Sequence, residues 1–75
     1  MKLPALSGKE LVKILSKSGF SIFDQYGSHL IMISEKDGIK RKAVIPQHKE
    51  LAKGTLLSIL KQAGLTREDL EKALK

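Results

Sequence analysis

The chain has two histidines, His29 and His48, and an imidazole exchanges protons near neutral pH because its ordinary pKa is about 6.5. RNA cleavage needs a base that removes the 2′-OH proton and an acid that protonates the leaving 5′ oxygen, and one histidine can serve one of these roles. His29 follows Gly27-Ser28, where a glycine lets another backbone or a ligand approach closely. His29 is therefore our candidate catalytic residue. The alternative is a histidine at the edge of a strand whose imidazole is satisfied by a backbone hydrogen bond, and this one residue, considered alone, favours that alternative.

His48 follows a predicted strand, and it is a second acid/base group, a phosphate contact or simply an exposed loop histidine. Other chemistry has less support. The chain has no cysteine, and the two histidines have no carboxylate at helical spacing, so we expect neither a metal site nor a cofactor. Ser28 has no evident carboxylate to complete a triad with His29, so we expect it to shape the turn.

Basic residues outnumber acidic ones, 14 to 8, and the formal net charge is +6. Such a balance favours polyanionic partners, although a solubilising surface explains it as well. Aromatic residues are scarce (two Phe, one Tyr and no Trp), which argues against base stacking and favours contacts to the RNA backbone. The residues that we expect to contact RNA are Lys9, Lys13, Ser28, Lys40, Arg41, Lys42, His48 and Lys53.

Local signals predict a first helix over about residues 8–18. Ser7 and Glu10 have the spacing of a capping box, and Leu6 and Leu11 that of a hydrophobic staple. Gly19 stands where a left-handed residue ends a helix. The lysines of this helix recur every four residues on the side opposite its apolar residues.

Three strands are predicted next, over residues 20–23, 28–34 and 40–45, with a break at Tyr26-Gly27 and Pro46 closing the third. Asp37-Gly38 is a strong hairpin signal. Because the connections are short, we expect an antiparallel meander.

Residues 47–54 are predicted to form a loop, and Thr55 to cap a second helix that stops at Gly64. A third helix is expected to begin at Thr66. The order α-β-β-β-α-α predicts a two-layer α+β sandwich, with helices on one face of a three-stranded antiparallel sheet and the other face open. The double-stranded-RNA-binding fold has a similar order, but a fold does not by itself establish a function.

The length of 75 residues predicts a single domain over residues 1–75, stabilised by apolar packing alone. Residues 1–5 have no apolar core of signal-peptide length, and no apolar run approaches a membrane span. We therefore expect a cytoplasmic protein with no membrane partner.

Four segments, residues 7–20, 27–29, 45–48 and 53–65, read SGKELVKILSKSGF, GSH, IPQH and KGTLLSILKQAGL. In this order and at this spacing they resemble the HicA (YcfA-like) toxins. The resemblance implies a double-stranded-RNA-binding-like fold and a toxin that cleaves mRNA without a metal, with His29 as the catalytic histidine. It also implies a HicB-type antitoxin that covers the active site and represses the operon.

One segment differs from the resemblance. Many HicA toxins carry basic residues just before Gly-Ser-His, whereas this chain has Asp24, Gln25 and Tyr26. A carboxylate there would repel a phosphate or, facing the other way, orient the histidine.

Three hypotheses follow. The first is an endoribonuclease toxin, a type II mRNA interferase inhibited by its antitoxin. The second is a non-catalytic RNA-binding module of the same fold. The third is a protein-interaction domain whose basic face meets an acidic partner. We favour the first over the second, and the first and third are compatible.

Overall fold

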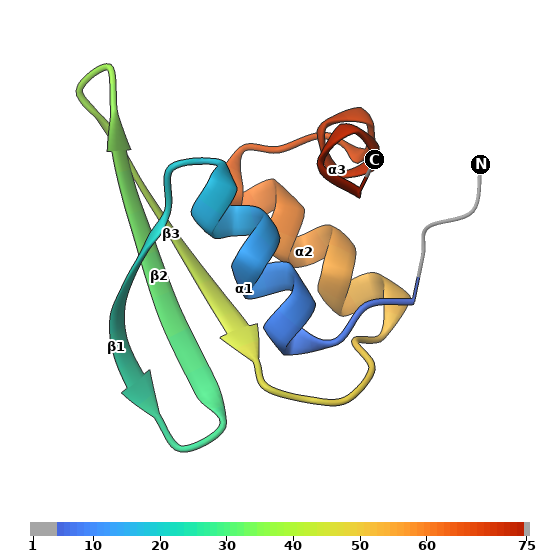
Figure 1. Cartoon of the computed structure of the whole chain (residues 1–75). Helices are drawn as coiled ribbons and strands as arrows, with labels where there is room; N and C mark the ends of the chain where they lie inside the picture. The colour runs from blue at the N-terminus through green and yellow to red at the C-terminus, as the bar shows by residue number, and fades with distance from the viewer. Residues whose placement is uncertain (1–4, 75) are drawn as a thin grey trace.

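Three antiparallel strands form one sheet, two helices cover one side of it, and a third helix packs against these helices on the side away from the sheet (Figure 1). The structure is a computed structural model in which residues 5–74 are described, so the first four residues of the segment tested for a signal peptide lie outside the described part. The elements are α1 Gly8–Lys17, β1 Ser21–Tyr26, β2 His29–Lys36, β3 Ile39–Pro46, α2 Lys53–Ala63 and α3 Arg67–Leu74. This order confirms the α+β class and the antiparallel meander predicted from the sequence.

The start of α1 has the predicted capping box. The Ser7 hydroxyl accepts a hydrogen bond from the Glu10 N–H (3.1 Å), and the Glu10 carboxylate accepts one from the Ser7 N–H (3.0 Å). Leu6 and Leu11 are both buried, as a hydrophobic staple requires. Gly19 follows the helix with φ of +96°, a conformation that costs glycine little. The sequence therefore predicted both ends of this helix to within a residue.

The first strand differs most from its prediction. β1 runs from Ser21 to Tyr26, whereas residues 20–23 with a break at Tyr26 were expected. Phe20 precedes the strand and is buried in the core, and Tyr26 still pairs with His29 across a turn made by Gly27 and Ser28. Every residue of β1 is exposed, so the strand has no apolar alternation to mark its length.

The two faces of the sheet are distinguished most clearly by β2. Leu30 and Met32 point into the hydrophobic cluster shared with the helices. His29, Ile31 and Ile33 alternate with them and so lie on the opposite side. We call this side the open face. By the strand register it carries Ser21, Asp24, Tyr26, His29, Ile31, Ile33, Glu35, Lys40, Lys42, Val44 and Pro46.

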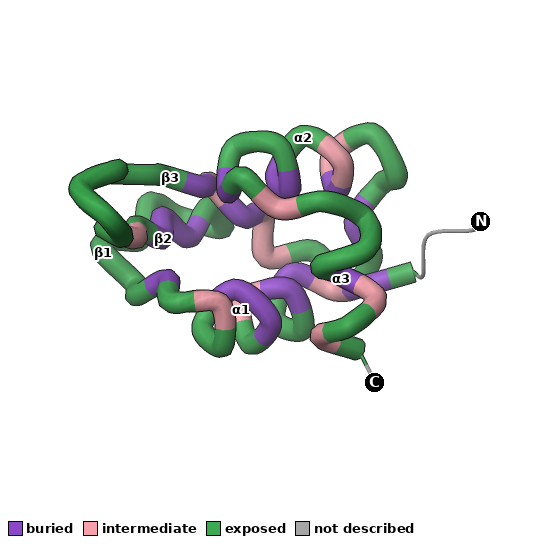
Figure 2. The backbone as a smooth tube through the Cα atoms, turned by 90° about the horizontal axis from the view of Figure 1, so that it is seen from above, coloured by how far each residue is buried: buried purple, intermediate pink, exposed green. Residues whose placement is uncertain are grey.

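The helices α1 and α2 cover the other face, both in contact with β3, and α3 packs against α1. Figure 2 shows the buried segments of the helices turned toward the interior, while β1 is exposed. The Gln62 side chain of α2 accepts a hydrogen bond from the Val44 N–H (3.2 Å) and so covers part of the outer edge of β3. The edge of β1 is the one that the helices leave uncovered.

The start of α2 corrects a prediction. The helix begins at Lys53, with Ala52 as an N-cap that provides no side-chain hydrogen bond, so Thr55 lies inside the first turn and is not the cap. Leu51 is buried, and its N–H donates to the Leu6 carbonyl (2.7 Å). This contact fixes the entry of the chain, so the helix starts at once and the loop is shorter than residues 47–54.

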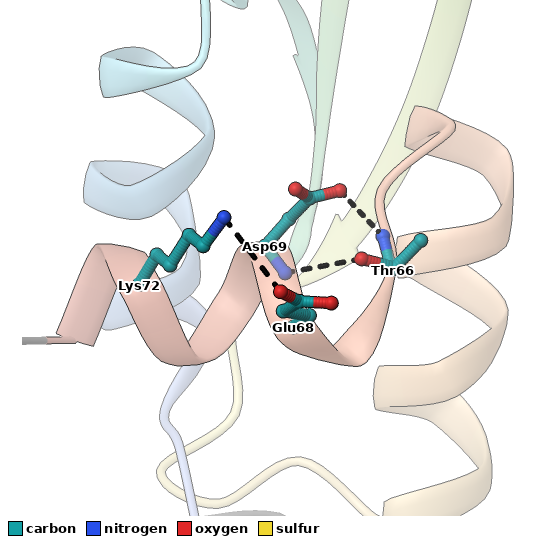
Figure 3. Close-up of polar contacts among 4 residues, drawn as sticks. All are labelled: Thr66, Glu68, Asp69 and Lys72. Atoms are coloured by element: carbon teal, nitrogen blue, oxygen red, sulfur yellow. Dashed lines mark hydrogen bonds and ion pairs between the residues drawn. The ribbon is translucent and has the colours of Figure 1, made fainter.

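The last helix, α3, begins at Arg67, one residue later than predicted, because Thr66 caps it (Figure 3). The Thr66 hydroxyl accepts a hydrogen bond from the Asp69 N–H (3.1 Å), and the Asp69 carboxylate accepts one from the Thr66 N–H (2.9 Å). Glu68 and Lys72 form an exposed ion pair one turn apart (3.7 Å). None of the helices described in residues 5–74 is long and apolar enough to cross a membrane.

Candidate functional site

Three segments that are distant in sequence meet at one end of the sheet. His29, the first residue of β2, pairs with Tyr26 on one side and with Pro46, the last residue of β3, on the other. The Gln47 N–H donates to the Ser28 carbonyl (2.7 Å), so the loop after β3 is bonded to the turn that carries His29. In Figure 1 this turn, the loop after β3 and the start of α1 all lie at the lower end of the molecule.

The start of α1 is held against the same loop. The Gly8 N–H donates to the His48 carbonyl (2.9 Å). A Cβ at Gly8 would lie 2.9 Å from the Gln47 Cα and even closer to the Pro46 carbonyl oxygen, so only glycine fits here. Gly8 therefore has a packing role that its place in the predicted helix did not reveal, and the backbone around both histidines is fixed.

His29 is exposed on the open face, and its imidazole makes no hydrogen bond to any residue of the described part. This argues against a histidine satisfied by the backbone. Gly27 has φ of +59° and no other group within 4 Å of the place of a Cβ. The glycine thus serves the tight turn, and no neighbouring backbone approaches it.

Asp24 and Tyr26 lie on the same face as His29. The Asp24 carboxylate, as a hydrogen-bond acceptor and as a negative charge, raises the pKa of Tyr26 above its ordinary value of 10.0. The phenol therefore stays protonated at neutral pH. Asp24 also accepts a hydrogen bond from the Gln25 N–H (2.8 Å), and within residues 5–74 no hydrogen bond joins it to His29.

His48 lines a hollow of about 240 Å³ together with Ser7, Lys9, Gln47 and Lys49. The hollow lies beside the start of α1, and both His48 and Lys9 are exposed. His48 follows Pro46, the strand partner of His29, by two residues. The fold therefore brings Lys9, Ser28, His29 and His48 to the same end of the sheet.

The remaining predicted RNA contacts are all exposed but lie elsewhere. Lys40 and Lys42 are on the open face, opposite Glu35 and Ile33. Arg41 alternates to the helix side, where its guanidinium lies over Gly64 at the C-terminal end of α2. Lys13 is one turn along α1 from Lys9, and Lys53 is the first residue of α2.

Sequence reasoning gave no role to the exposed aromatic residues. Phe23 and Tyr26 are 66% and 63% exposed, although composition alone made aromatic residues look too rare to matter. The signal was present in residues 21–26, where the absence of any alternation of apolar and polar residues marks a strand with no buried face. In the described part, no three acidic or histidine side chains come together as a metal-ligand set.

A family model described as "HicA toxin of bacterial toxin-antitoxin" matches residues 8–65 of the 75. The chain belongs to the HicA toxin family. The match runs from the capped start of α1 through β1, β2 and β3 to the second residue after α2, and it includes both histidines. This HicA chain is accordingly the toxin of a toxin–antitoxin pair. No curated protein and no solved structure matches the chain.

Proposed function

We propose that this HicA toxin is a metal-independent endoribonuclease that cleaves mRNA, with His29 as a catalytic acid/base. The observation that carries the proposal is the position of His29: an exposed imidazole, free of hydrogen bonds to residues 5–74, at the end of the sheet where three fixed segments meet. A general acid or base must reach the substrate and must not be neutralised by a structural partner. His29 meets both conditions.

The reaction follows from the chemistry of RNA. The 2′ oxygen attacks the adjacent phosphorus while a base takes its proton, and the P–O5′ bond breaks while an acid protonates the leaving 5′ oxygen. The products are a 2′,3′-cyclic phosphate and a 5′-hydroxyl. His29 takes one of the two proton transfers, and His48, at the same end of the sheet, is the candidate for a phosphate contact or for the other.

Lysines near the site supply the electrostatic part of the proposal. Charge builds up on the phosphorane oxygens in the transition state, and positioned cations stabilise it. Lys9 lies beside His48, and Ser28 precedes His29 in the turn. Lys13, Lys40, Lys42 and Lys53 would contact phosphates farther along the chain of RNA.

The partners follow from the family and the site. A toxin that cleaves mRNA acts in the cytoplasm and needs an antitoxin, which we propose is of the HicB type and covers His29. An acidic antitoxin surface would complement the net charge of +6.

The test is to express the wild type, His29→Ala and His48→Ala in a host without the antitoxin and to follow growth and mRNA integrity. We expect arrest and mRNA cleavage with the wild type, and a loss of about 10²- to 10⁴-fold in the cleavage rate of purified His29→Ala. Because His29 is exposed, the thermal unfolding midpoint of this variant should match that of the wild type.

The other outcomes are equally informative. Intact mRNA and normal growth with every protein, together with RNA binding by the wild type, would replace the nuclease by a non-catalytic RNA-binding module. Equal cleavage by wild type and His29→Ala would make His29 dispensable and turn attention to His48→Ala.

A further inference from the structure

Two large aromatic side chains project from β1 into solvent on the side of the sheet that carries His29. Tyr26 is directly opposite His29 in the strand pair, and Phe23 lies three residues before it. Because a strand rises about 3.3 Å per residue, the two rings are attached within roughly 10 Å of each other. Two of the three aromatic residues of the chain therefore lie outside the hydrophobic core.

A β-bulge explains how Phe23 reaches this side. The register of β1 against β2 shifts between Ile22 and Asp24, which leaves Phe23 as the extra residue. Phe23 lines a hollow of about 360 Å³ with the open-face residues Ile33, Glu35, Lys40 and Lys42, and Ser34 and Arg41 from the alternate positions complete its lining. Bulges re-aim side chains next to functional sites, and this one adds an aromatic ring to the open face.

The charge of this hollow selects the ligand. Its apolar lining comes from Phe23 and Ile33, and its charged lining is three basic residues against one acidic residue: Lys40, Arg41 and Lys42 against Glu35. Neither lysine has an ion-pair partner within 4 Å in the part of the chain that the structure describes. Stacking rings beside unpaired cations are the two components with which proteins hold single-stranded nucleic acid. We therefore favour RNA over a protein partner as the ligand of this surface, although the proposed antitoxin, by covering His29, would reach the same side of the sheet.

We propose that single-stranded RNA lies across the open face, with one base stacked on Tyr26 next to the scissile phosphate, a second base on Phe23, and phosphates bound by Lys42 and Lys40. This inference rests on the proposed function, since it describes how substrate reaches His29. It selects unpaired RNA, because only bases released from a duplex can stack on side chains. The open face, rather than the helices, is then the substrate platform.

The first measurement uses a property of the chain itself. Tyr26 is the only tyrosine, and there is no tryptophan, so the intrinsic fluorescence of the protein reports on this one ring. The probe is a short single-stranded RNA of mixed sequence in which every 2′-OH is methylated, so that it cannot be cleaved. We expect it to quench the Tyr26 emission, and the same strand annealed to its complement to quench it far less.

The second measurement compares variants by the binding of the same oligonucleotide, labelled for anisotropy. Phe23→Leu and Tyr26→Leu should each raise the dissociation constant by about 5- to 150-fold, the range for a lost stacking contact. Tyr26→Phe keeps the ring and should bind as the wild type does. Ile39→Ala is the matched control, because Ile39 is an exposed apolar residue of β3 on the other side of the sheet.

The outcomes separate this inference from the proposed function. If both leucine variants bind the RNA as tightly as the wild type while the wild type still cleaves RNA through His29, the platform is wrong and the nuclease stands. If the leucine variants keep their affinity for RNA but escape neutralisation by a co-expressed antitoxin, the open face is a protein interface and the inference is overturned. A wild type that neither binds nor cleaves RNA would remove the proposed function itself.

Discussion

The two faces of β2 differ in what their residues do. On the helix side, Leu30 and Met32 are buried in the hydrophobic cluster with residues of all three helices. On the open face, His29 is exposed and Ile33 is 38% exposed, one residue away from Met32, which is fully buried. The same strand thus supplies packing on one side and chemistry on the other, because alternate residues of a strand point in opposite directions.

This division follows from the small size of the chain. With no disulfide and no buried polar group in the described part, stability depends on the aliphatic contacts between the helices and one face of the sheet. The open face has one buried residue, Ile31 at 9% exposure, and it lies outside the main cluster. The other side chains of that face are therefore free to serve binding and catalysis with little cost in stability.

The largest effect expected in stability distinguishes adjacent residues. Met32→Ala should lower the free energy of unfolding by about 2–5 kcal/mol, because it removes a buried side chain and leaves a cavity. Ile33→Ala should lower it by about 1 kcal/mol or less, because that side chain is already partly in water. Urea unfolding of both variants measures the difference. Equal losses would mean that the open face also belongs to the core.

The fold was predictable from the sequence wherever local chemistry or alternation determined it. Ser7, Glu10 and Gly19 bounded the first helix, and the Asp37-Gly38 turn placed the second hairpin. The start of α2 was not predictable in this way, because its position is set by the contact of Leu51 with Leu6, far away in sequence. Thr55 is of a residue type that often caps helices, but here it lies inside the first turn of α2.

The candidate site was predictable in part. The residue types identified the histidines and lysines as candidates, but they did not predict on which side of the sheet each one lies. Lys40 and Lys42 fall on the open face, while Arg41 between them packs over Gly64. The exposure of β1 follows from its lack of alternation, but a bulge places Phe23 on the same face as Asp24 and Tyr26, and no pattern in residues 21–26 indicates that bulge. These features arise from strand register, and register depends on contacts between segments rather than on one segment.

An intermediate effect tests this alternation along β3. Lys42→Ala should weaken RNA binding and reduce the slope of log affinity against log salt by about 0.7, as for one lost phosphate contact to single-stranded RNA. Arg41→Ala should leave that slope unchanged and lower stability by about 0.3–1 kcal/mol, because a cation is lost from the C-terminal end of α2. RNA affinity measured for both variants over a series of salt concentrations distinguishes the two roles. A reduced slope in Arg41→Ala would place its guanidinium on the RNA.

The smallest effect concerns the cap of α1, which belongs to the helix layer yet adjoins the loop of His48. The hydrogen bonds from the backbone and side chain of Ser7 lower the pKa of Glu10 below its ordinary 4.5, with a further contribution from Lys13. A carboxylate with a lowered pKa stabilises the folded state above its ordinary pKa, and this stabilisation disappears as the pH falls through the folded-state pKa.

Glu10→Gln removes the charge but keeps an oxygen that can accept the Ser7 N–H. We therefore expect the wild type to unfold at a slightly higher temperature than this variant at pH 7, and the difference to vanish in acid. Thermal melts at pH 7 and in acid measure this difference in unfolding temperature, with Glu71→Gln as a control in which no cap is altered. A difference that is the same at both pH values would show that the amide fails as a cap, so that geometry rather than charge stabilises this helix end. Because Glu10 lies on the helix layer, RNA cleavage at pH 7 should be unchanged, which again separates the residues that hold the fold from those that face the RNA.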